Sequence, residues 1–237
     1  MRTVEEVAAE VGAGAELAHG WTLHAVEPVT PAEATAVLAE PAAAVPQSAA
    51  QRLGTLRLFA APFLACGGEA EFVAAEKPEG ESHSSLWLER GEAGAPPVAR
   101  PSGNGARRRG PAIDLFIAIR DADAHDAGFE LLAVVADLLT PRLSDDEFLS
   151  YARLLQQEIA EGATGEIDEE ALEARDSADP DYVTVSLAST LAEYLHALWH
   201  DVEVRQGAGH LAPQFLRRRF ELLAGIFPPH PGQTLFR

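Results

Sequence analysis

The clearest pattern in the chain runs from Pro111 to Glu161 and reads PAIDLFIAIRDADAHDAGFELLAVVADLLTPRLSDDEFLSYARLLQQEIAE. Residues 113–119 are apolar and rich in β-branched and aromatic side chains, which is typical of a strand covered on both faces. An acidic turn follows, and after it a helix with two apolar edges. This helix is expected to end at Thr140-Pro141, because proline disfavours helical geometry in the residue before it.

A second helix is predicted directly after this break. Ser144 and Glu147 have the spacing of a capping box, in which each side chain accepts a hydrogen bond from the other residue's backbone amide. Apolar residues recur at helical intervals from Phe148 to Ile159, and Gly162 is expected to end the helix. Residues 111–161 therefore predict a strand followed by two helices.

This strand, the acidic turn with its histidine, the helix ELLAVVADLL and the second helix resemble the second half of the IIA domains of the mannitol/fructose phosphotransferase class. They are also similar to the related cytoplasmic domain of the anion-exchanger (bicarbonate transporter) family. IIA domains carry a phosphoacceptor histidine in a motif such as Ala-(Ile/Leu)-Pro-His. This chain has Ala61-Pro62-Phe63 and Glu-Ser-His83-Ser instead. The resemblance therefore implies an IIA-like sandwich and fits a non-catalytic relative.

The rest of the chain predicts further strands and helices around this unit. Strands are expected near residues 21–26, 55–65, 69–76 and 84–89, the last two forming a meander in the same sheet as 113–119. Helices are expected at 3–11, from 31 to just before Pro41, at 46–53, at 182–204 and at 212–226. Residues 162–181 are acidic and are expected to behave as a linker or an exposed arm, with part of the segment helical.

The expected fold class is therefore α/β, a mixed sheet flanked by helices, with an α-helical C-terminal extension. The domain division that we expect is an N-terminal helix at 1–20, an α/β domain at 21–165 and a helical extension at 166–237. The extension is expected either to dimerise or to pack on the α/β domain.

Composition limits the function classes. The 237 residues carry a formal net charge of −19, which argues against nucleic-acid binding because phosphates would be repelled. A single cysteine excludes an intramolecular disulfide framework. The first residues lack the apolar run of a signal peptide, and the longest apolar runs are too short to span a bilayer. We therefore expect a cytoplasmic protein without direct membrane insertion.

One candidate site is the acidic turn after residues 113–119, which contains Asp121, Asp123, His125 and Asp126. It follows the C-terminal end of a strand, where α/β folds usually place their sites. By the resemblance, His125 corresponds loosely to an auxiliary histidine beside the phosphoacceptor. The alternative is structural, since carboxylates at a helix start cap amides and are favoured by the helix dipole.

A second candidate is the set Glu193, His196, His200 and Glu203, whose spacing places them on one helical face opposite the apolar stripe. Glu-x-x-His is half of a di-iron signature, and two histidines four residues apart suit zinc. No partner Glu-x-x-His is found on another predicted helix, and spacing implies no third zinc ligand. A polar face with local ion pairs is thus the preferred interpretation, and no metal or cofactor is expected.

The leading functional hypothesis is a non-catalytic regulatory or assembly protein that acts through protein–protein contact. Its partner would be a basic protein, a membrane transporter or a second copy of the chain. One alternative is a divergent histidine phosphocarrier that uses His83 or His125. Another is an acidic inhibitor or immunity-like protein for a basic partner.

Overall fold

The computed structural model describes most of the chain, namely residues 2–10, 12–67, 70–79, 82–90, 98–101, 112–120, 123–200, 209–233 and 235. Two predicted site residues, Asp121 and Glu203, lie outside these ranges. The structural statements that follow concern the described residues.

The larger of two sheets has six strands in the order β2-β3-β4-β10-β8-β9. Their bounds are Ala15–Glu16, Thr22–Ala25, Thr55–Ala61, Ala112–Ala118, Ser85–Arg90 and Val98–Pro101. β10 pairs in parallel with β4 and antiparallel with β8, so the sheet is mixed. Residues 113–118 are all buried. The prediction of a strand covered on both faces is therefore confirmed.

The smaller sheet has the order β1-β6-β5-β7, with bounds Arg2–Thr3, Ala70–Ala74, Phe63–Gly67 and Ser82–His83. β4 and β5 are separated by Pro62, which cannot donate a ladder hydrogen bond. The chain leaves the larger sheet at this point. The predicted meander is therefore wrong for residues 69–76, because β6 pairs with β5 and β1 in the smaller sheet. Of the two strands predicted for the meander, only β8 pairs with β10.

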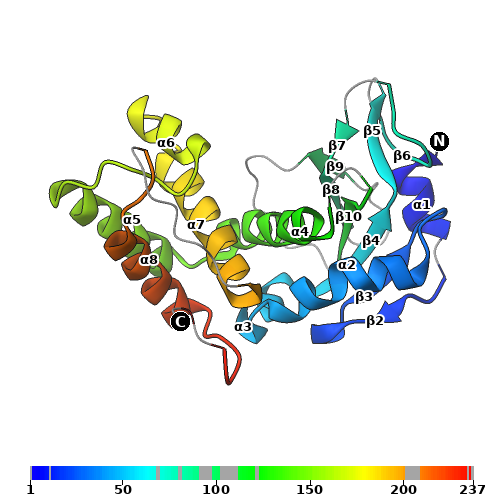
Figure 1. Cartoon of the computed structure of the whole chain (residues 1–237), viewed down its shortest axis with the longest axis horizontal. Coiled ribbons are helices and arrows are strands. Elements are labelled where there is room, and N and C mark those ends of the chain that lie inside the picture. Colours follow the sequence, from blue (N-terminus) through cyan, green and yellow to red (C-terminus); the bar gives the residue numbers. More distant parts are fainter. Residues whose placement is uncertain are drawn as a thin grey trace.

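Eight helices accompany the sheets in the described residues. Their bounds are α1 Val4–Glu10, α2 Pro31–Ala44, α3 Gln47–Leu53, α4 Ala124–Leu139, α5 Asp145–Ala160, α6 Glu169–Asp176, α7 Tyr182–Trp199 and α8 Pro213–Ile226. Figure 1 shows α4 near the middle, with α1 and most strands on one side of it and α5 to α8 on the other. The expected α/β fold with a helical C-terminal region is confirmed.

Each face of the larger sheet has its own apolar core. One core joins Leu58 and Leu115 to α2, α3, α4 and the C-terminal helices. The other joins Phe59 and Phe116 to Val7 of α1 and to the smaller sheet. The first core runs continuously from the sheet into α7 and α8, while the division into three sequence domains stays a prediction.

The prediction that the helix beginning at residue 31 stops before Pro41 is wrong, since α2 continues to Ala44. An internal proline costs a helix about 3 kcal/mol. Pro41 and Ala42 are both buried in α2, and Ala42 belongs to the first core. We infer that this burial outweighs the lost backbone hydrogen bond.

The expected start and end of α5 are confirmed. The Ser144 amide donates to Glu147 Oε2 at 2.8 Å, and the Glu147 amide donates to Ser144 Oγ at 3.3 Å. Gly162, directly after the helix, has φ +91°. A residue with a Cβ rarely adopts that conformation, so glycine suits the stop.

The prediction that residues 162–181 form a linker or exposed arm is wrong in part. The helical part of the segment is α6, but Glu166 is buried with Glu158 and Arg219. Arg219 donates to Glu158 Oε2 at 2.8 Å and to both carboxylate oxygens of Glu166 at 2.7 and 3.1 Å. This buried ionic network ties α5, α8 and the segment before α6 together.

No helix among the described residues is both long and apolar enough to cross a membrane.

Candidate functional site

The two candidate clusters of the sequence meet in the folded chain. His125 lies in the first turn of α4, and His196 lies in the last turn of α7. Their Nε2 atoms are 3.1 Å apart, although 71 residues separate them in sequence. His200, the residue after α7, places its ring centroid 5.2 Å from that of His125. We call these three residues the histidine cluster.

Asp123 fixes the start of α4 and so positions His125. Its side chain accepts a hydrogen bond from the Asp126 amide at 2.9 Å. Carboxylates at this end of a helix also interact favourably with the helix dipole. The capping interpretation of the acidic turn is therefore confirmed for Asp123. Asp123, His125 and Asp126 also each place one potential ligand atom within 4.8 Å of the others, and all three are exposed.

Trp199 forms one wall of the cluster. Its indole stacks on the His125 imidazole, with ring centroids 5.4 Å apart and an interplanar angle of 18°. A Cβ at Gly128 of α4 would lie 2.3 Å from Trp199 Cη2, far closer than two carbons can approach. Glycine at this position therefore lets the indole lie against α4. Phe129 packs edge-on against His196, with centroids 4.9 Å apart.

Each imidazole of the close pair also faces a carboxylate. Glu193 Oε2 lies 3.6 Å from His196 Nδ1, and Asp126 Oδ1 lies 3.8 Å from His125 Nδ1. The two Nε2 atoms thus point toward each other while the two Nδ1 atoms lie beside acidic groups. The prediction of a single helical face is wrong at His200, because α7 ends at Trp199 and the His200 backbone is extended. Glu193 and His196 do share a face of α7, and the His196 side chain is only 15% exposed.

His83, the other histidine considered for phosphoryl transfer, lies in β7 of the smaller sheet. Its Nε2 is 3.4 Å from Glu71 Oε2. The smaller sheet and α4 contribute to different apolar cores, so the two histidines belong to separate parts of the packing. The phosphocarrier hypothesis stays a prediction.

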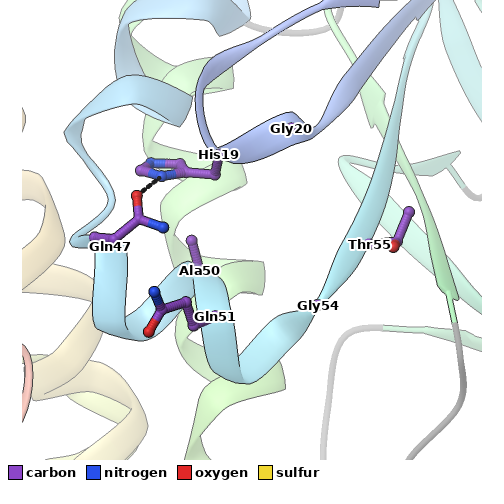
Figure 2. Close-up of a pocket in the computed structure, with 7 residues that line it drawn as sticks. All are labelled: His19, Gly20, Gln47, Ala50, Gln51, Gly54 and Thr55. Atoms are coloured by element: carbon purple, nitrogen blue, oxygen red, sulfur yellow. Dashed lines mark hydrogen bonds between the residues drawn. The ribbon is translucent and has the colours of Figure 1, made fainter.

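A separate cavity of about 230 Å³ opens beside α3 (Figure 2). Its lining residues are His19, Gly20, Gln47, Ala50, Gln51, Gly54 and Thr55. His19 has φ +65°, which is unusual for a residue with a Cβ, and its Nδ1 lies 3.0 Å from Gln47 Oε1. The sequence reasoning missed this cavity, for which the His19-Gly20 pair before Trp21 is the only visible signal.

One carboxyl group outside the cluster has a strongly changed acidity. Burial raises the pKa of Asp137 on α4 to about 6, and the neighbouring carboxylates of Glu170 and Glu130 add to the effect. Because Asp137 lies in the last turn of α4, at the opposite end of the helix from His125, this group affects stability rather than the histidine cluster.

Comparison of the chain with protein-family models, with curated proteins and with solved structures gave no match. The resemblance to IIA and anion-exchanger domains stays a prediction.

Proposed function

We propose that the chain acts through protein–protein contact, as a regulatory or assembly protein, and that the outer face of α5 binds a second copy of the chain. One observation carries this proposal. Leu149 and Ile159 of α5 are 45% and 49% exposed, and they are the large hydrophobic side chains exposed among the described residues. Exposed apolar surface of this kind is a common feature of protein interfaces.

The spacing along α5 supports a helix–helix contact. Leu149, Ala152, Gln156 and Ile159 are separated by three, four and three residues, the spacing of a heptad interface. We call these four uncharged residues the α5 stripe. The neighbouring side of the helix packs into the core through Tyr151 and Leu155. α5 therefore has one face for folding and another for a partner.

The charge of the chain favours the stripe as the place where two copies would meet. A net charge of −19 makes two copies repel each other over most of their surfaces. A contact centred on uncharged residues avoids placing carboxylates of one copy against those of the other. In an antiparallel two-fold contact, Leu149 of one copy packs against Ile159 of the second. Figure 1 places α5 at the end of the molecule away from the strands, where a second copy has room.

Sedimentation equilibrium of wild type and of Leu149→Glu and Ile159→Glu tests this proposal. Burying the exposed half of such a side chain contributes about 1 kcal/mol, and each substitution acts in both copies. We expect a wild-type dimer and at least roughly 30-fold weaker association in each variant. Ala36→Glu adds the same charge at an exposed position of α2 and should associate like wild type. A monomeric wild type, or equal effects of all three substitutions, would contradict the proposal.

The acidic inhibitor is a second candidate, because the region around α6 is strongly charged. Seven exposed carboxylates lie between residues 168 and 181: Asp168, Glu169, Glu170, Glu173, Asp176, Asp179 and Asp181. A basic partner bound there would be released by salt, because screening weakens contacts between exposed charges. If the affinity for a basic protein changed neither with salt nor in the double variant Glu169→Gln/Glu173→Gln, the region around α6 would be excluded as its binding surface.

A further inference from the structure

We propose that the histidine cluster is a binding site for a divalent transition metal ion of the Zn²⁺ type, with His125, His196 and His200 as ligands. This inference is independent of the proposed function. It rests on the close approach of His125 Nε2 of α4 to His196 Nε2 of α7, with the ring of His200 nearby.

The separation of the two Nε2 atoms fits a shared metal ion. Zn²⁺ binds imidazole nitrogen at about 2.0–2.1 Å, so two ligands of a tetrahedral site lie about 3.3 Å apart. The observed distance between His125 Nε2 and His196 Nε2 is 3.1 Å. The separation of the two atoms would therefore change by only a few tenths of an ångström on metal binding, while both rings would turn so that their lone pairs point at one ion. In the metal-free chain, the same two atoms share a proton in a hydrogen bond.

The carboxylates around the pair have the arrangement of outer-shell groups in metal sites. A histidine that binds a metal usually donates its other ring N–H to a carboxylate, a backbone carbonyl or a water molecule. Glu193 lies beside His196 Nδ1 at 3.6 Å, and Asp126 lies beside His125 Nδ1 at 3.8 Å. Both carboxylates thus lie on the Nδ1 side of the two rings, where a small movement would let each accept a hydrogen bond from an Nδ1–H when Nε2 binds the metal.

His200 supplies the third ligand. Its backbone is extended, with φ −128° and ψ 159°, and its side chain is exposed. Its ring centroid lies 5.2 Å from that of His125 and 6.3 Å from that of His196. A rotation of the His200 side chain brings one ring nitrogen to the ion, and the fourth position is left to water. His125 is 51% exposed, so the ion can enter from solvent.

Packing around the cluster holds the first two ligands in place. Trp199 stacks on His125, Phe129 contacts His196, and Gly128 admits the indole against α4. Rigid support of this kind reduces the ordering that metal binding requires. The arrangement is more specific than two histidines on one helix, because its ligands come from two packed helices.

Calorimetric titration of the untagged protein with Zn²⁺, and visible spectroscopy with Co²⁺ as a probe of geometry, test this site. We expect one equivalent of Zn²⁺ and the intense visible absorption of tetrahedral Co²⁺. His125→Ala and His196→Ala should abolish stoichiometric binding, and His200→Ala should weaken it and alter the Co²⁺ spectrum. Glu193→Gln should weaken binding about 10- to 100-fold through loss of the outer-shell contact.

His83→Ala is the matched control, because His83 also faces a carboxylate but belongs to the smaller sheet. It should bind Zn²⁺ like wild type, and so should Leu149→Glu, which separates this site from the proposed dimer. The exposed His200 keeps the test valid if His196→Ala does not fold. Absence of stoichiometric Zn²⁺ and Co²⁺ binding, or equal loss in His83→Ala and His200→Ala, would overturn the proposal.

Discussion

Replacing Arg219 with methionine should strongly destabilise the chain, because it removes the only cation of the buried ionic network described above. The side chains of Arg219, Glu158 and Glu166 are each 1% exposed. Besides its contacts with the two carboxylates, Arg219 donates to Ser186 Oγ at 3.0 Å. The Arg219→Met variant would leave two carboxylates buried without a countercharge.

The magnitude follows from this burial. Removing one partner of a buried ion pair costs about 3–5 kcal/mol. Burial already raises the pKa of Glu158 even though Arg219 opposes the shift, so without the arginine this carboxyl should take up a proton. Because ordinary domains are stable by about 5–15 kcal/mol, a loss of about 4 kcal/mol is a large fraction. It should lower the Tm by about 10 °C in a chain of this size.

Urea unfolding followed by circular dichroism and by tryptophan fluorescence measures the loss directly. The informative comparison is the triple variant Glu158→Leu/Glu166→Met/Arg219→Met. Apolar replacement of a whole buried ion network is often neutral or stabilising, so the triple variant should recover most of the lost stability. The reasoning is refuted if Arg219→Met unfolds within about 1 kcal/mol of wild type, or if the triple variant is no more stable than the single one.

Three further substitutions test other parts of the structure. The pKa of the Asp137 carboxyl rises from 3.8 to about 6 on folding, so the wild-type fold loses stability as this group ionises between pH 4 and pH 7. Asp137→Asn does not ionise. Its free energy of unfolding in urea, relative to wild type, should therefore grow by up to about 3 kcal/mol over that range. Gly128→Ala should cost about 1–2 kcal/mol in thermal unfolding and change the Trp199 fluorescence, because the added Cβ collides with the indole. Two hydrogen bonds from Arg52 lower the pKa of Glu147 to about 2, so Glu147→Gln should cost about 1–2 kcal/mol at pH 7 and lose that deficit as pH falls from 4.5 toward 2. No change with pH in either carboxyl variant, or a Gly128→Ala chain as stable as wild type, would contradict the corresponding packing.

Local patterns in the sequence were enough to predict the central strand and the two helices after it. A continuous apolar run marks β10, apolar residues at helical spacing mark α4, and the capping box at Ser144 marks the start of α5. These features depend on neighbours a few residues apart, so the sequence shows them directly. α2 exceeded its predicted length because the burial of Pro41 depends on distant residues of the core.

The candidate site was visible only in halves. The spacing of residues on α7 and the acidic start of α4 were both evident, but nothing in either segment shows that they touch. The contact depends on the packing of α4 against α7, which Gly128 permits by accepting Trp199. A glycine inside an otherwise strong helix was the available signal for such a close approach. Glu166 was missed for the same reason, since its partner Arg219 lies 53 residues away.

Thiol cross-linking at the α5 stripe tests the central claim, that the chain works through contact between copies at this surface. In a Cys66→Ser background, Gln156→Cys places one thiol on the stripe, and Ala36→Cys places one at an exposed position of α2. With a short bifunctional thiol reagent, we predict a covalent dimer for Gln156→Cys, none for Ala36→Cys, and loss of the dimer when Leu149→Glu is added. Equal cross-linking at both positions, or a Gln156→Cys chain that stays monomeric, would contradict the claim.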